Sequence, residues 1–150
     1  MLSFRPAKIS DLITLVKMLS DDQLGIKREN YSLPLDDGYI TAFEIIDNDP
    51  NNELIVAELD NQIIGMLQLT FIPYLTHQGS WRCLIEGVRV HENFRGQGFG
   101  TQLFEWAIER AKQQGCKIVQ LTSNKQRSTA IKFYQRLGFE ASHEGLKLYL

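Results

Sequence analysis

The segment Arg95-Gly96-Gln97-Gly98-Phe99-Gly100 joins an apolar, strand-like run at residues 81–90 to a stretch with helical spacing of apolar residues. That helical stripe consists of Leu103, Phe104, Ala107, Ile108 and Ala111 and stops at Gly115. A strand, a glycine-rich turn and a helix in this order bring unpaired backbone N–H groups and the positive end of a helix dipole to one point. The turn therefore predicts a phosphate-binding site, to which Arg95 adds a charged contact.

Two widespread phosphate-binding patterns do not fit this turn. A P-loop ends in Gly-Lys-Ser/Thr, whereas Thr101 follows Gly100 and no lysine precedes it. A dinucleotide-binding turn has the pattern G-x-G-x-x-G, but here the glycines alternate, and the acidic residue expected on a second strand is absent. A glycine turn without any ligand stays open as an alternative at this point.

The rest of the chain predicts a mixed α/β sheet. Strands are expected at residues 2–5, 54–59, 63–71, 81–90, 117–122, 139–141 and 146–149, with helices at 12–19, 39–46, 103–111 and about 128–136. Asp60-Asn61 suits the positive backbone angles of a tight hairpin between the second and third strands. The order strand, helix, strand, helix after residue 81 requires at least one parallel pairing.

Composition narrows the class of protein. The 150 residues, 43% of them hydrophobic, predict one domain at residues 1–150. The formal net charge of -2 provides no basic field for nucleic acid. No N-terminal signal pattern and no membrane-spanning run are visible, so we expect a cytoplasmic protein without a membrane partner. Cys83, Cys116 and the three dispersed histidines lack metal-ligand spacing, and no metal is expected.

Three segments in order resemble the GNAT superfamily of N-acetyltransferases. Arg95-x-x-Gly98-x-Gly100 resembles that superfamily's coenzyme A pyrophosphate motif, Glu86-Gly87-Val88-Arg89-Val90 its central strand, and the segment from Ala130 to Phe139 its later motif. The resemblance implies a twisted mixed sheet of about six or seven strands, about four flanking helices and a splayed central strand. It also implies acetyl-coenzyme A as cosubstrate and a primary amine as acceptor, and dimers are common among proteins of this kind.

The resemblance also implies a pose for the cofactor. Gly87 can host a bulge that leaves backbone groups of Val88 and Val90 unpaired, so that the pantetheine amides can lie along the strand and end near Glu86. The implied cofactor contacts are Val88, Arg89, Val90, Arg95, Gly96, Gln97, Gly98, Phe99, Gly100, Thr101, Asn124 and Arg127. For Asn124 and Arg127 the assignment is divided, because Arg127 aligns with a family asparagine and Asn124 lies slightly earlier. Arg127 can also meet the 3′-phosphate or form part of a solvated basic surface.

Two side chains are candidates for proton transfer. Glu86 is the carboxylate within residues 81–90, and an amine of pKa near 10.4 needs a base, directly or through water, before it attacks a thioester. Tyr134, within the motif that resembles the family, can protonate the departing thiolate. A structural role for each side chain is the alternative reading. No cysteine has a nearby histidine in sequence, so we expect direct attack without a covalent enzyme intermediate.

The acceptor and the activity itself leave alternatives. The preferred function is N-acetylation of a small-molecule amine, and the loops at residues 21–37 and 73–81 are expected to line the acceptor side. Acetylation of a protein lysine or N-terminus is a further alternative, which differs in needing an open peptide groove that the sequence does not show. A non-catalytic acyl-coenzyme A sensor or partner module is the alternative from another class.

Overall fold

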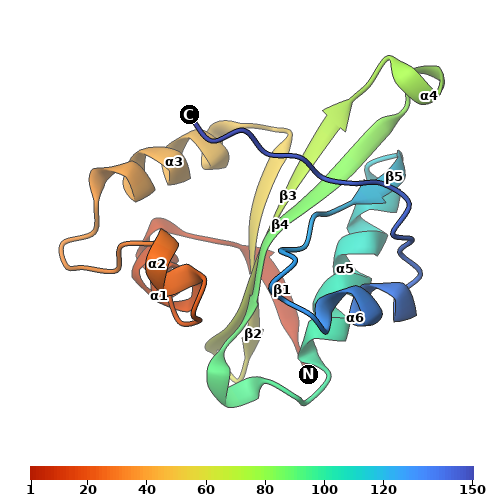
Figure 1. Ribbon diagram of the computed structural model, residues 1–150. Coiled ribbons are helices and arrows are strands. Elements are labelled where there is room, and N and C mark those ends of the chain that lie inside the picture. Colours follow the sequence, from red (N-terminus) through yellow and green to blue (C-terminus); the bar gives the residue numbers. More distant parts are fainter. The chain divides into compact units, whose positions relative to one another are not determined.

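A computed structural model describes all 150 residues of the chain, which form two compact units, residues 1–120 and 121–150. The first unit is built on a five-stranded mixed sheet (Figure 1). The strands follow one another in sequence order across the sheet and are β1 (Ser3–Pro6), β2 (Asn52–Leu59), β3 (Gln62–Pro73), β4 (Trp81–Val90) and β5 (Cys116–Gln120). Strands β1 to β4 pair antiparallel, whereas β5 pairs parallel to β4. The expected hairpin and the expected parallel crossover are both confirmed.

Helices cover both faces of this sheet. The helices of the first unit are α1 (Leu12–Leu19), α2 (Gly25–Arg28), α3 (Asp37–Asn48), α4 (Thr76–Gly79) and α5 (Phe99–Gln113), with short 3-10 helices at Ile9–Asp11 and Glu92–Phe94. The second unit contains α6 (Ala130–Arg136). In Figure 1, α1 and α3 lie on one side of the sheet and α5 on the other. No helix has both the length and the apolar character needed to cross a membrane.

Apolar packing fixes the helices on the two faces. On the first face, Leu15 and Val16 of α1 and Phe43 of α3 share a buried cluster with Val56 and Met66 of the sheet. On the other, α5 presents a fully buried stripe of Leu103, Phe104, Ala107 and Ala111. Burying one such leucine contributes about 1.5–3 kcal/mol, so the two layers hold β3 and β4 rigidly between them.

Residue types explain the β2–β3 hairpin turn and the contacts that hold β1 to its neighbours. Asp60 and Asn61 adopt φ of 50° and 64°, as expected for a two-residue turn. Arg5 donates to Asp11 at 2.7 Å and to Glu58 at 2.7 Å, which ties β1 to the start of α1 and to β2. The hydrogen bond from Arg5 lowers the pKa of the Asp11 carboxyl.

The predicted closing strands are wrong. The second unit, residues 121–150, contains α6 and then no strand, so the sheet has five strands rather than six or seven. Leu146, Leu148 and Tyr149 are largely exposed. Their alternation marks a possible strand face, but a strand also needs a neighbouring edge to pair with, and none of the five strands pairs with them. The helix count exceeds four because α2 and α4 are single turns of four residues.

Candidate active site

Strand β4 carries a bulge at the predicted glycine. Gly87 adopts φ of 61°, in the left-handed region. Arg89 pairs with Met66 and Glu86 with Gln68, so Leu67 alone opposes both Gly87 and Val88. One extra residue on one strand is the definition of a bulge, and it bends the strand. The predicted bulge is therefore confirmed.

The splay of the central strand is also confirmed. Strand β5 pairs with β4 only from Trp81 to Leu84, and residues 85–90 have no neighbouring strand on that side. The backbone N–H of His91 donates to the Ile64 carbonyl of β3 at 2.7 Å. Because alternate residues of a strand direct their backbone groups to the same side, Val88 and Val90 direct theirs to the open edge.

The carbonyl groups at this edge are not unpaired, which corrects the expectation for Val88 and Val90. The Val88 carbonyl accepts from Nη1 of Arg89 at 2.8 Å, and the Val90 carbonyl accepts from Nε of Arg95 at 3.0 Å. Two long cationic side chains thus fold back on the backbone that precedes the turn. The N–H groups of both valines still face the edge where no strand meets them.

The glycine turn leads directly into α5. Gly96 and Gly98 adopt φ of 75° and 85°, and a Cβ built on either residue meets no atom within 4 Å. Gly98 is the N-cap, so the N–H groups of Phe99, Gly100 and Thr101 stand at the start of the 15-residue helix without intrahelical partners. Open space, exposed donors and the helix dipole make this turn fit a diphosphate.

Two contacts stiffen the turn. The Gln97 side chain donates to the Asn93 carbonyl at 3.3 Å. The Phe99 ring meets Phe94 edge to face, with ring centroids 6.2 Å apart. The 3-10 helix at Glu92–Phe94 is thereby packed against the turn, and the backbone donors keep their positions before a ligand arrives.

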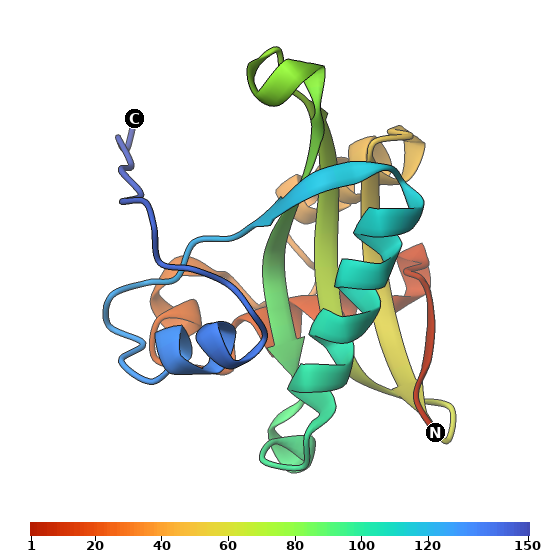
Figure 2. The ribbon, with the colours of Figure 1, turned by 90° about the vertical axis from the view of Figure 1, so that its right-hand side faces the viewer.

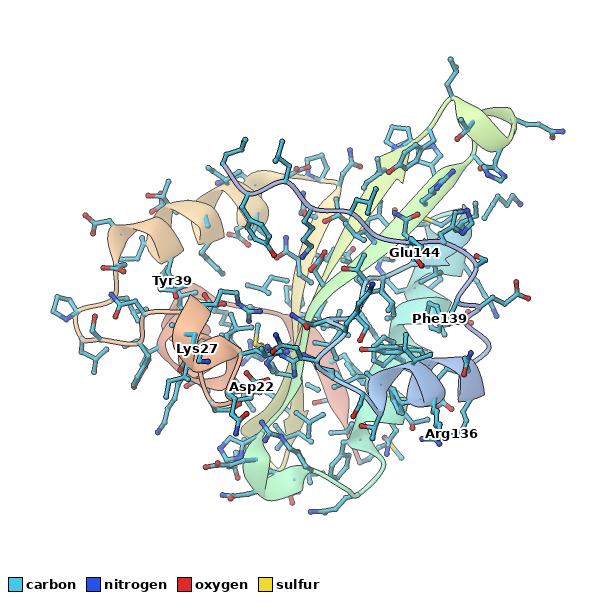
Figure 3. The ribbon with its side chains drawn as sticks, viewed as in Figure 1. Asp22, Lys27, Tyr39, Arg136, Phe139 and Glu144 are labelled. Atoms are coloured by element: carbon cyan, nitrogen blue, oxygen red, sulfur yellow. The ribbon has the colours of Figure 1, made fainter.

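Arg95 already has an anionic partner. Its Nη2 contacts both carboxylate oxygens of Asp21 at 2.9 and 3.0 Å, although its side chain is 46% exposed. Asp22, labelled in Figure 3, lies next in the chain, with a carboxylate oxygen 3.9 Å from Nη2 of Arg89. The segment after α1 therefore places Asp21 against Arg95 and Asp22 near Arg89, and Asp21 occupies one edge of the Arg95 guanidinium.

Replacing Asp21 by asparagine is expected to tighten coenzyme A binding by about two- to fivefold. The reason is that an exposed ion pair contributes about 0.2–1 kcal/mol, and this contribution no longer opposes the ligand. Isothermal titration calorimetry measures the change, with Asp47→Asn on the exposed side of α3 as the charge-matched control. Equal affinities of wild type and Asp21→Asn would show that phosphate and Asp21 do not compete for Arg95.

Glu86 lies beside the splay and is exposed. It pairs in register with Gln68 of β3, so both side chains project from the same face of the sheet. That face also carries Val56 and Met66 beneath α1. Because Glu86 is accessible, a solvent molecule and an amine can both approach its carboxylate, and a buried charge is not involved.

The other predicted residues lie in the second unit. Tyr134 of α6 packs edge to face against Phe133 and Phe139, with centroid distances of 5.5 and 6.1 Å. The Asn124 side-chain oxygen accepts from the backbone N–H of Gln126 at 2.9 Å, and the Asn124 backbone carbonyl accepts from the backbone N–H of Arg127. These contacts shape the loop and helix internally, and the placement of the three residues next to the cofactor stays a prediction.

The cysteines do not offer a nucleophile. Burial raises the pKa of the Cys83 thiol to about 12, and it also raises the pKa of Cys116. A thiol with a raised pKa is protonated at neutral pH and attacks poorly. This supports direct attack on the thioester.

A comparison of the sequence with known protein families identifies a family that agrees with the observed sheet, splayed strand and glycine turn. Residues 18–139 match the profile of the Acetyltransferase (GNAT) family. The chain belongs to this GNAT family. The GNAT family uses acetyl-coenzyme A as acetyl donor.

Individual relatives show how far the similarity extends within the GNAT family. The chain is 35% identical over 95 residues to aminoalkylphosphonate N-acetyltransferase of Salmonella typhimurium, a match that covers 63% of this chain and 61%, less than two thirds, of that protein. A crystal structure described as a transcriptional regulator from Bacillus halodurans C-125 has a TM-score of 0.97 and 57% identity, with both chains covered completely. A putative acetyltransferase from Agrobacterium tumefaciens has the same fold, with a TM-score of 0.84, 24% identity and 99% of each chain covered.

The sequence did not indicate a polar band on the sheet of this GNAT protein. The polar band is the row of polar side chains on the sheet face that carries Glu86; its members are Asn52, Gln68, Thr70, Arg82, Glu86 and Gln120. Asn52 Oδ1 accepts from Gln68 at 3.2 Å and from Thr70 at 2.7 Å. The available signal was the alternation of Gln68 and Thr70 within an otherwise apolar strand.

Proposed function

We propose that this chain is an N-acetyltransferase that transfers the acetyl group of acetyl-coenzyme A to the primary amine of a small molecule by direct attack. The proposal rests on one observation: the part of β4 that β5 leaves unpaired leads directly into the glycine turn, whose backbone N–H groups are exposed at the start of α5. The family match crosses from the first unit into the second, which supports a single N-acetyltransferase domain over residues 1–150.

The cofactor is proposed to lie along the open edge of β4. The N–H groups of Val88 and Val90 are directed there and can bond the pantetheine carbonyls, as an added strand would. The N–H groups at the start of α5 and the Arg95 side chain can then hold the diphosphate. When bound, the cofactor supplies a thioester as the acetyl donor.

Glu86 is proposed to remove a proton from the attacking amine through a water molecule. A lysine-like amine with pKa near 10.4 is mostly protonated at neutral pH and attacks only in its neutral form. The exposed position of Glu86, next to the bulge at Gly87, lets amine and water meet its carboxylate. When the amine attacks, the thioester oxygen gains negative charge, and a backbone N–H near Val88 at the open edge can stabilise that charge.

Tyr134 is proposed to donate a proton to the departing thiolate. A phenol of pKa near 10 can protonate a thiolate whose conjugate acid has a pKa near 8.5 as charge develops in the transition state. Tyr134→Phe is expected to lower kcat by about 10²-fold while coenzyme A affinity is unchanged. Thiol release measures kcat, and the exposed Tyr149→Phe is the matched control. A Tyr134→Phe enzyme with wild-type kcat would assign the hydroxyl a purely structural role.

A second candidate function is an acyl-coenzyme A-binding module without transfer. It is the alternative from another class named in the sequence analysis, whereas the family match and the name of the Salmonella typhimurium relative favour transfer to a small amine. Calorimetry with coenzyme A, followed by thiol release from acetyl-coenzyme A across an amine panel, separates the two. Saturable binding with amine-dependent release supports the enzyme, and saturable binding without release supports the module.

A further inference from the structure

We propose that Arg82 binds an acid group of the acceptor, so that the substrate is a small amine carrying a carboxylate or phosphonate several bonds from its nitrogen. The inference rests on the proposed N-acetyltransferase function and specifies the acceptor. Its basis is the polar band, which places a cation and the proposed base on one face of one strand.

The polar band lies where a sheet face is normally apolar. Strands β3 and β4 are interior strands, and the part of this face that carries Val56 and Met66 is buried beneath α1 and α3. Further along, the register brings Gln68 opposite Glu86 and places Leu84 between Thr70 and Gln120. Polar groups on interior strands need hydrogen-bond partners from the protein, from solvent or from a polar ligand, because burying them without partners is unfavourable. The band is therefore suited to a polar acceptor.

Arg82 is held in place by neutral groups. Nη1 donates to Gln120 Oε1 at 3.2 Å, and Nη2 donates to Thr76 Oγ1 at 3.2 Å. The guanidinium carbon lies 4.3 Å from the centroid of the Tyr74 ring. Tyr74 and Thr76 belong to the β3–β4 hairpin, whose tip with α4 extends beyond the other strands (Figure 2). The guanidinium is thus oriented before any ligand binds.

No carboxylate of the protein balances this charge. Arginines that pair with acids are Arg5, Arg28, Arg89, Arg95 and Arg110. Arg82 has no such pair, and its Nε is buried without a hydrogen-bond partner. Only two of the five N–H donors of this guanidinium are used. A half-buried, oriented guanidinium with spare donors is suited to a planar carboxylate or a phosphonate.

The spacing of Arg82 and Glu86 sets the kind of molecule. The two residues lie four positions apart on the same face, so their Cα atoms are separated by about 13 Å at 3.3 Å per residue. An ammonium group next to Glu86 leaves the other end of a small molecule directed along the band towards Arg82. An acid at that end is attracted, whereas a second amine is repelled, which disfavours polyamines.

The test compares matched amines with and without an acid: β-alanine against propylamine, and aminohexanoate against hexylamine. For the wild type, KM is expected to be at least about tenfold lower for the better acid-bearing amine than for its match. Arg82→Gln should abolish this difference and change kcat less than about twofold, and Arg82→Lys should restore part of it. Lys117→Gln, which removes an exposed cation from the neighbouring strand β5, should leave the difference intact.

Two results would overturn the assignment: no preference of the wild type for acid-bearing amines, or an equal rise in KM for both members of a pair in Arg82→Gln. Failure of the proposed function has a different signature, which is the absence of thiol release with every amine. In that case the acid-binding role of Arg82 is tested by calorimetric titration of aminohexanoate into the protein in the presence of coenzyme A. Binding that Arg82→Gln abolishes supports the acid-binding role, and no binding to the wild type contradicts it.

Discussion

Gly98→Val is expected to weaken coenzyme A binding by about 100-fold or more while the protein stays folded. Gly98 has φ of 85° and caps α5, and the space that its Cβ would enter is open. In the proposed complex that space belongs to the diphosphate, so a valine side chain excludes the ligand and also turns the backbone donors away from it. A 100-fold loss corresponds to about 2.7 kcal/mol, which the loss of two charged hydrogen bonds can account for.

Gly115→Val provides a close control for this substitution. Gly115 follows the other end of α5 and has φ of 77°, and a Cβ at this residue would also meet no atom within 4 Å. Both variants therefore carry a similar backbone strain of about 1–3 kcal/mol. Thermal unfolding should show similar decreases in Tm, and calorimetry should show a loss of affinity only for Gly98→Val. If the two variants bind coenzyme A equally well, the turn does not hold the diphosphate.

The features of the fold and of the site that the sequence predicted correctly depend on the conformational preferences of individual residues. The positive φ at Asp60 and Asn61 follows from residue type and needs no knowledge of the rest of the chain. The bulge at Gly87 and the left-handed turn at Gly96 and Gly98 follow in the same way. Since these features lie at the open edge of β4 and the start of α5, the main cofactor contacts could be proposed without a structure.

The parts that sequence missed depend on pairings between distant segments. Arg95 and Asp21 are 74 positions apart, and nothing local to either residue indicates that they meet. The polar band exists only once the register of β3 and β4 is fixed, because a shift of one residue moves every side chain to the other face. The absent strands near the C-terminus are the converse case, in which alternation was visible but none of the five strands pairs with residues 139–149.

Glu86→Gln is expected to lower amine-dependent acetyl transfer at neutral pH by about 10²- to 10⁴-fold, the usual contribution of a general base. The substitution keeps the size and hydrogen-bonding capacity of the side chain and removes its ability to take a proton. Because Glu86 is exposed and lies outside the turn, coenzyme A affinity should not change. Glu105→Gln, on the exposed side of α5, is the control that removes a charge without touching the site.

The pH profile tests whether proton removal is the reason for this loss. At pH 7, an amine of pKa 10.4 is neutral in about one molecule in 2,500, and this fraction rises about tenfold with each pH unit. The Glu86→Gln enzyme depends on that neutral fraction, so its rate should rise with pH up to the pKa of the amine. The wild type, which generates the neutral amine at the site, should level off earlier, and the ratio of the two rates should fall as pH increases. A ratio that stays constant across pH would mean that Glu86 orients the acceptor or the cofactor and takes no proton from the amine.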